Sequence, residues 1–195
     1  MSEKAIAHLY HSDLFVKNDV GTEEQRADLL KQVLYAKENN LETSSMSNDG
    51  CWRSTKKYKM GWLYEELRNL VSKATAVYMQ SDKPFEAFVK QGVGLDFACW
   101  TNVNEVGSKN NLHTHTKDCW AGIYYIQAEG TGNLTFFNPA NTLLQCNPKS
   151  PMIRSYGVTP KDGDLFIWPG WVPHQVEENK SNQQRINLAF SINLT

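Results

Sequence analysis

The sequence predicts an α+β fold in a single domain spanning residues 1–195, with a helical part over about 1–90 and a β-rich core over about 91–195. Two observations predict it. Apolar residues in the first part recur at helical spacing, whereas from Phe85 onward short apolar runs are separated by Gly, Asn and Pro. Helices followed by an uninterrupted run of strands are typical of α+β domains whose strands form a sandwich or barrel.

The helical part contains an expected opening strand, two helices and a polar loop. The strand covers 5–16 and carries His8 and His11, which we expect to be ordinary surface or edge residues. Thr22 and Gln25 form a capping box that opens the first helix, which ends near residue 40. A polar loop over 41–55 follows, and its Trp52 either packs on the core or covers a pocket.

The second helix is expected over about 60–80. Each helix has one apolar face, so both should buttress one side of a sheet. These faces consist of Leu29, Leu30, Val33 and Leu34 in the first helix, and of Leu63, Leu67, Leu70, Val71, Ala74, Val77 and Tyr78 in the second. The β-rich core should contain strands at about 93–104, 120–127, 133–138, 152–158, 164–168 and 184–193.

The composition excludes several classes of protein. With 20 basic and 21 acidic residues the net charge is -1, which gives no electrostatic reason to expect nucleic acid or an anionic membrane as partner. No apolar run approaches the ~20 residues of a membrane span, and no signal-peptide pattern opens the chain, so we expect a cytoplasmic protein. The four cysteines, Cys51, Cys99, Cys119 and Cys146, show no C-x-x-C pairing and should be reduced thiols.

Three histidines form a candidate metal site. His113 and His115 are two positions apart, and on a strand such residues point to the same face. His174, from a neighbouring strand, would complete one face of a metal octahedron. Imidazole suits iron, copper, nickel and zinc, and three ligands leave positions open for substrate and oxygen.

The motifs around these histidines resemble a known family. They comprise Trp100-Thr101-Asn102, Asn111-Leu112-His113-Thr114-His115, Trp120-Ala121-Gly122-Ile123-Tyr124-Tyr125, Gly132–Phe136, Pro160–Phe166, Trp168-Pro169, His174 and Arg185–Phe190. Over residues 93–193 the chain resembles the double-stranded β-helix (jelly-roll, cupin-like) oxygenases that depend on Fe(II) and 2-oxoglutarate. The resemblance is greatest to small oxygenases of marine bacteria and phages, related to prolyl-hydroxylase-like dioxygenases. It implies a jelly-roll core with N-terminal buttressing helices.

The resemblance also implies a ligand set, with one departure. Most of the superfamily reads His-x-Asp, giving two histidines and a carboxylate, but here His115 occupies the second position. Either His113, His115 and His174 bind the metal, or Asp118 supplies a carboxylate from the following loop. The three-histidine set is favoured because positions i and i+2 already share a face.

The resemblance places the cosubstrate 2-oxoglutarate at Arg185, Tyr125 and Asn187. The guanidinium of Arg185 would form a two-pronged ion pair with the distal carboxylate, because its fork matches that planar group. Asn187 shares the face of Arg185, and Tyr125 aligns with a tyrosine that lies beside the arginine. Tyr124 would face the opposite side, and a structural role for both tyrosines stays open.

The implied activity is that of a dioxygenase using Fe(II), 2-oxoglutarate and O2. It would couple oxidative decarboxylation of 2-oxoglutarate to hydroxylation of an amino-acid, peptidyl (for example prolyl) or small-metabolite substrate. The loops 41–59 and 142–151 are expected to shape the substrate opening. Two alternatives stay open, a cupin-type metalloenzyme without 2-oxoglutarate and a non-catalytic jelly-roll binding module. A homodimer also stays open.

Overall fold

The computed structural model describes residues 12–39, 46–54, 60–78, 94–139 and 154–195. Its strands form a nine-stranded sheet in the order β1-β7-β4-β9-β3-β8-β5-β6, with β2 paired to β3. The strands are β1 Phe15–Lys17, β2 Asn48–Arg53, β3 Leu95–His113, β4 Trp120–Gln127, β5 Leu134–Phe137, β6 Ser155–Val158, β7 Leu165–Pro169, β8 His174–Val176 and β9 Arg185–Leu194. All of their pairings are antiparallel.

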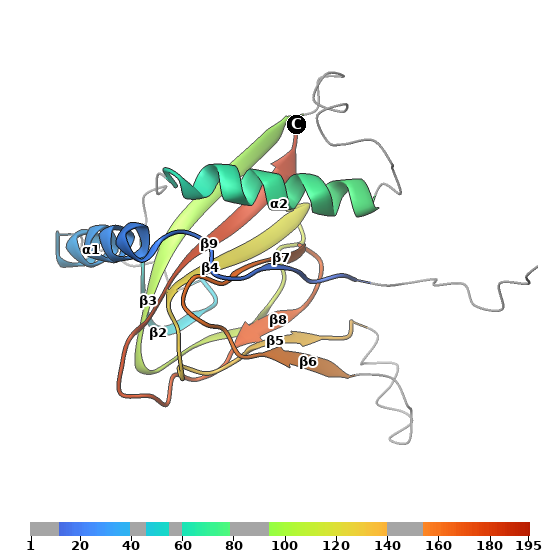
Figure 1. Ribbon diagram of the computed structural model, residues 1–195. Helices are drawn as coiled ribbons and strands as arrows, with labels where there is room; N and C mark the ends of the chain where they lie inside the picture. Colours follow the sequence, from blue (N-terminus) through green and yellow to red (C-terminus); the bar gives the residue numbers. More distant parts are fainter. Residues whose placement is uncertain (1–11, 40–45, 55–59, 79–93, 140–153) are drawn as a thin grey trace, which may run out of the picture.

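The sheet curls on itself through its longest strand, β3. From Leu95 to Asn104 this strand pairs with β9, and at Asn110 and His113 it pairs with β8. In Figure 1, β4, β7 and β9 lie beneath helix α2 (Leu63–Tyr78), whereas β5, β6 and β8 form a separate lower layer. This curled antiparallel sheet with two helices confirms the expected double-stranded β-helix.

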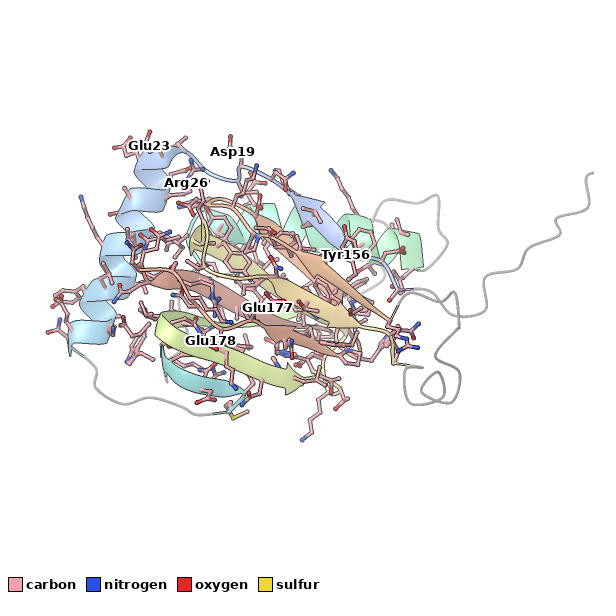
Figure 2. The ribbon with its side chains drawn as sticks, turned by 90° about the horizontal axis from the view of Figure 1, so that it is seen from below. Asp19, Glu23, Arg26, Tyr156, Glu177 and Glu178 are labelled. Carbon is pink, nitrogen blue, oxygen red and sulfur yellow. The ribbon has the colours of Figure 1, made fainter. Side chains whose placement is uncertain are left out.

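Both helices pack on the outer face of the curl. Helix α1 (Glu23–Asn39) opens with the expected capping box, since Gln25 N donates to Thr22 Oγ1 (3.2 Å) and Thr22 N donates to Gln25 Oε1 (2.8 Å). Figure 2 shows Asp19, Glu23 and Arg26 gathered where α1 begins, and Arg26 pairs with Asp19 at 3.0 Å. The helices therefore buttress one side of the sheet as expected.

The alternation of side chains along the strands creates two cores. The first lies between the helices and the sheet and includes Tyr124, Phe190 and Trp52, which is 9% exposed. Trp52 thus packs on the core, the first of the two expected roles. The second core lies inside the curl and includes Tyr125, so the two tyrosines face opposite sides as expected. Val77 departs from the expected face of α2, because it is 53% exposed near the end of that helix.

Several strand boundaries differ from those expected. The polar loop 41–55 contains β2, whose polar residues have little intrinsic strand preference and are held by the ladder with β3. Strand β3 continues to His113 rather than ending at 104. The neighbouring strand expected to carry His174 is the short β8, which begins at that residue. The described part of the opening strand is β1 alone, and residues 5–11, with His8 and His11, lie outside the described residues. Neither described helix has the length and apolarity needed to cross a membrane.

Candidate metal centre

His113, His115 and His174 come together at one end of the curl. His113 is the last residue of β3 and lies directly opposite His174, the first residue of β8, in the ladder. The ring centroids lie 4.3 Å apart for His113 and His174, 5.2 Å for His113 and His115, and 5.3 Å for His115 and His174. One ring nitrogen from each residue lies within 4.8 Å of the others, which is a metal-ligand spacing.

His115 reaches the cluster from a turn rather than from a strand. The expectation that both residues of the His-x-His pair lie on a strand is wrong, because β3 ends at His113. His115 N donates to Gly170 O (2.7 Å), and Asp118 N donates to His115 O (2.8 Å). A Cβ at Gly170 would lie 2.2 Å from Asp118 O and 2.6 Å from His115 O, so only glycine permits this approach.

The outward nitrogen of each imidazole is held by an oxygen atom. His113 Nδ1 lies 2.7 Å from Asn111 O, and His174 Nδ1 lies 2.9 Å from Val172 O. A carbonyl only accepts, so Nδ1 carries the hydrogen in both rings and Nε2 keeps its lone pair. His115 Nδ1 lies 3.1 Å from Ser191 Oγ, which donates its own hydrogen elsewhere and therefore accepts from this ring. In all three rings, therefore, Nδ1 carries the hydrogen and Nε2 has a free lone pair that could bind a metal.

Burial keeps the three imidazoles neutral. It lowers the pKa of His113, and together with the neighbouring His113 it lowers the pKa of His115 to about 4 and that of His174 to about 3. The side chain of His174 is only 3% exposed. A neutral imidazole is the form that binds metal, so the cluster is in its ligand form at neutral pH.

Asp118 lies behind His115 rather than among the converging nitrogens. Its Oδ2 accepts from Ser191 Oγ (2.6 Å), and its Oδ1 accepts from Asn193 Nδ2 (3.0 Å). The distance from Asp118 Oδ2 to His115 Nδ1 is 3.6 Å. Asp118, Ser191 and His115 therefore form a hydrogen-bonded chain that ends on an imidazole of the cluster.

The other predicted residues lie deeper in the curl. The side chain of Arg185 is 0% exposed, and its Nη1 donates to Thr131 O and to Glu177 O, the latter at 3.0 Å. Glu177, labelled in Figure 2, follows β8 directly. The Nε and Nη2 atoms of Arg185 and the hydroxyl of Tyr125 are buried without a hydrogen-bond partner among the described residues.

Arg185, Tyr125 and Asn187 sit at the inner face of β9 and β4, where Tyr125 and Asn187 are paired in the ladder. Burial raises the pKa of Tyr125, and Arg185 nearby lowers it in part. Burial lowers the pKa of Arg185, and Tyr125 opposes that effect. Asn187 Oδ1 accepts from Asn102 Nδ2 at 2.8 Å, so its oxygen is engaged within the protein.

A cavity of about 690 Å³ opens beside the histidine cluster. Trp100 stacks on His115 with ring centroids 6.1 Å apart and an interplanar angle of 12°, and Trp168 meets His174 edge-on at 4.7 Å. The described part of the segment 41–59 contributes Met46, Ser47, Asn48 and Arg53 to the lining, as expected. Residues 142–151 lie outside the described residues.

Sequence reasoning missed two groups of residues at this site. Ser191 and Asn193 follow Arg185, Asn187 and Ala189 at every second position of β9, so the period-two alternation was a usable signal. Arg53 carried no comparable signal, because the polar stretch around it was expected to be a loop.

Comparison with known proteins gives the enzyme class. Residues 98–191 match the family described as "Putative 2OG-Fe(II) oxygenase". The match spans just under half of the chain and supports a 2-oxoglutarate-dependent dioxygenase. The matched residues include all three histidines of the cluster and Arg185. The match therefore favours the oxygenase over the cupin-type and non-catalytic alternatives. A 2-oxoglutarate-dependent dioxygenase requires Fe(II), 2-oxoglutarate and O2, and the histidine cluster offers a set of donors for iron.

Solved structures share the fold. A prolyl-4-hydroxylase from Pseudomonas putida matches with a TM-score of 0.62 at 14% identity, covering 92% of this chain and 91% of that one. A prolyl hydroxylase from Trichoplax adhaerens gives 0.57 at 12%, covering 92% and 82%. The non-haem α-ketoglutarate-dependent carbocyclase SnoK of nogalamycin biosynthesis gives 0.57 at 13%, covering 92% and 78%. None of the curated proteins compared with this chain matches it.

Proposed function

We infer that the enzyme is a hydroxylase of an amino-acid, peptidyl or small-metabolite substrate, with His113, His115 and His174 as the ligands of Fe(II). The inference is supported by one ring nitrogen from each histidine lying within 4.8 Å of the others. Because Nδ1 of each ring faces an oxygen atom, Nε2 is the nitrogen left for a metal. Three imidazoles suit iron and leave coordination positions open. When bound, Fe(II) and 2-oxoglutarate supply the activation of O2, with succinate and carbon dioxide as coproducts.

We assign the distal carboxylate of 2-oxoglutarate to Arg185 and Tyr125. The observation that carries this assignment is a set of buried polar atoms that lack partners in the protein: Arg185 Nε, Arg185 Nη2 and Tyr125 Oη. Buried polar groups are nearly always hydrogen-bonded, so such a group of unpaired donors points to a ligand. Two N–H groups of one guanidinium match a carboxylate in two-pronged geometry. Asn187 lies on the same face and would act beside them.

Asp118 has an indirect role in this proposal. Both of its oxygens are engaged by Ser191 and Asn193, and Ser191 in turn accepts from His115. Outer carboxylates of this kind orient metal-bound imidazoles and raise their basicity. We therefore assign the third ligand to His115 and assign Asp118 to holding the ring of His115.

The test is metal and cosubstrate binding in three proteins: wild type, His174→Ala and Arg185→Lys. Wild type should bind one Fe(II) and then 2-oxoglutarate, measured anaerobically by metal analysis and calorimetry. His174→Ala should lose the iron while keeping its circular dichroism spectrum. Arg185→Lys should keep the iron but bind 2-oxoglutarate roughly ten- to a hundredfold more weakly, because a point charge replaces the fork.

Two results would overturn the proposal. Unchanged iron content in His174→Ala would remove His174 from the metal site. A wild-type protein that binds iron but no 2-oxoglutarate would leave Arg185 and Tyr125 with another function.

A further inference from the structure

Trp168 buries a hydrogen-bond donor that has no acceptor within the described protein. Its side chain is 3% exposed, and its Nε1 atom has no hydrogen-bond partner among the described residues. In that part of the chain, the only other buried side-chain nitrogens without a partner are Nε and Nη2 of Arg185. Buried polar groups are nearly always hydrogen-bonded, so this indole N–H indicates an acceptor on a bound molecule.

The indole lies at the histidine end of the curl. Its ring meets that of His174 edge-on at 4.7 Å, and it lines the cavity beside the cluster. In the sheet, Ala121 lies opposite Trp168 on one side and opposite Ser191 on the other. Because Ser191 is hydrogen-bonded to His115, Trp168 stands at the same level of the sheet as the proposed metal ligands.

The unpaired nitrogens of Arg185 and Trp168 lie at two ends of one interior. Arg185 is deeper, next to Thr131 O and Glu177 O, and we have assigned its Nε and Nη2 to the distal carboxylate of 2-oxoglutarate. That molecule has a second carboxylate beside its keto group. A cosubstrate that is anchored at Arg185 and serves a metal at the cluster brings this second carboxylate toward the histidines.

The second carboxylate needs hydrogen-bond donors, because an ionised group is costly to remove from water without them. The Nδ1 hydrogens of the three imidazoles already face protein oxygens. The indole N–H of Trp168 is the buried nitrogen donor that remains at this end.

The edge-on contact with His174 gives the same N–H a weaker alternative, which is to face the π-system of that imidazole. Interactions of N–H groups with aromatic rings are second-order contacts. A hydrogen bond to an ionised oxygen is about twice as strong as one between neutral groups. A carboxylate within reach should therefore take the N–H from the ring.

We propose that Trp168 is a cosubstrate-binding residue whose indole N–H donates to the carboxylate of 2-oxoglutarate beside the keto group. This inference rests on the proposed function and adds a second anchor at the histidine end. It predicts discrimination against 4-oxopentanoate. That compound keeps the distal carboxylate and the ketone but has a methyl group in place of the second carboxylate.

The first measurement uses wild type labelled with ¹⁵N at tryptophan and loaded with zinc in place of iron, which avoids a paramagnetic ion. The indole resonance of Trp168 is assigned through its proximity to the rings of Phe136 and His174, which requires no variant. Saturation with 2-oxoglutarate should move the indole proton downfield and slow its exchange with solvent. Addition of 4-oxopentanoate should leave the resonance in place.

The second measurement is calorimetric titration of 2-oxoglutarate into two zinc-loaded variants. Trp168→Phe keeps an aromatic ring beside His174 and removes the N–H, so it should bind zinc normally and 2-oxoglutarate roughly ten- to a hundredfold more weakly. The matched control is Trp120→Phe. Trp120 is buried in the other core against Phe15 and Tyr78, and the same change there should alter affinity less than twofold.

Three results would overturn the proposal. The indole resonance may not respond to saturating 2-oxoglutarate, which would leave the N–H on the imidazole ring. An equal response to 4-oxopentanoate would place the acceptor elsewhere on the molecule. Equal affinities of Trp168→Phe and Trp120→Phe for 2-oxoglutarate would remove the anchor. In all three, wild type still binds 2-oxoglutarate and the proposed function stands, whereas a wild type that binds none contradicts the proposed function itself.

Discussion

Removing one oxygen atom from Tyr125 should change stability and cosubstrate affinity in opposite directions. The hydroxyl of Tyr125 is buried and has no hydrogen-bond partner among the described residues, although its ring packs edge-on against Phe166 at 6.0 Å. Tyr125→Phe keeps that ring. If 2-oxoglutarate is the missing partner, the hydroxyl is unfavourable in the protein alone and favourable in the complex.

The magnitudes follow from the burial. An unpaired buried hydroxyl costs about 1–3 kcal/mol, so its removal should leave the melting temperature of the cosubstrate-free protein unchanged or higher. For a chain of this size each kcal/mol corresponds to roughly 2–4 °C. In the complex the same hydroxyl would donate to a carboxylate, a bond worth ~1.5–3 kcal/mol. Tyr125→Phe should therefore weaken 2-oxoglutarate binding by about ten- to a hundredfold.

The adjacent Tyr124 supplies the control. Its hydroxyl donates to Val20 O at 2.7 Å in the other core, so Tyr124→Phe leaves that carbonyl with only the longer contact from Arg26 Nη1 (3.5 Å). That variant should melt a few degrees lower, since the lost pairing costs about 1–3 kcal/mol, and it should bind 2-oxoglutarate normally. Differential scanning fluorimetry and anaerobic calorimetry give the two readouts. A lower melting temperature for Tyr125→Phe with unchanged affinity would refute the reasoning.

Three further predictions concern the histidine cluster. His115→Ala should lose Fe(II), whereas Asp118→Asn should bind stoichiometric iron with roughly 10–100-fold weaker affinity. Metal titration measures both effects, and the reverse order of the two variants would make Asp118 the ligand. Gly170→Ala should weaken iron binding, measured in the same titration, because its Cβ would lie 2.2 Å from Asp118 O and displace the turn that carries His115. The pKa values of His115 (about 4) and His174 (about 3) lie below the ~6.5 of an unfolded histidine, so the unfolded chain binds more protons between these values. The metal-free protein should therefore lose stability as pH falls from ~6.5 toward 4, and urea unfolding of His174→Gln should show a shallower loss.

The sequence was most informative where local pattern and tertiary structure agree. The Thr22–Gln25 capping box, the buried stripe of α2 and the opposite faces of Tyr124 and Tyr125 depend on spacings of one to four residues. Such spacings are visible in a single chain. The double-stranded β-helix depended on the resemblance, because the apolar runs alone were compatible with any sandwich or barrel.

The boundaries that were missed depend on partners distant in sequence. Strand β2 pairs with residues of β3 that lie 49 to 62 positions later, and its polar side chains give no strand signal of their own. The position of His115 depends on Gly170, which accepts its backbone hydrogen bond from a different loop. The engagement of Asp118 by Ser191 and Asn193 likewise brings together residues more than 70 positions apart.

If His115 binds the metal in place of a carboxylate, as we propose, the charge of the site changes and Asp118 offsets that change in part. Three neutral imidazoles leave Fe(II) with a charge of +2, whereas a carboxylate ligand would bring the site to +1. Asp118 keeps a negative charge 3.6 Å from His115 Nδ1 and is linked to it through Ser191. That carboxylate favours a partial transfer of the Nδ1 hydrogen and so makes the imidazole a stronger donor. In that proposed arrangement the negative charge of Asp118 would act on the metal through the imidazole of His115, which would itself be a neutral ligand. The remaining positive charge would favour the anionic cosubstrate that we assign to Arg185 and Tyr125.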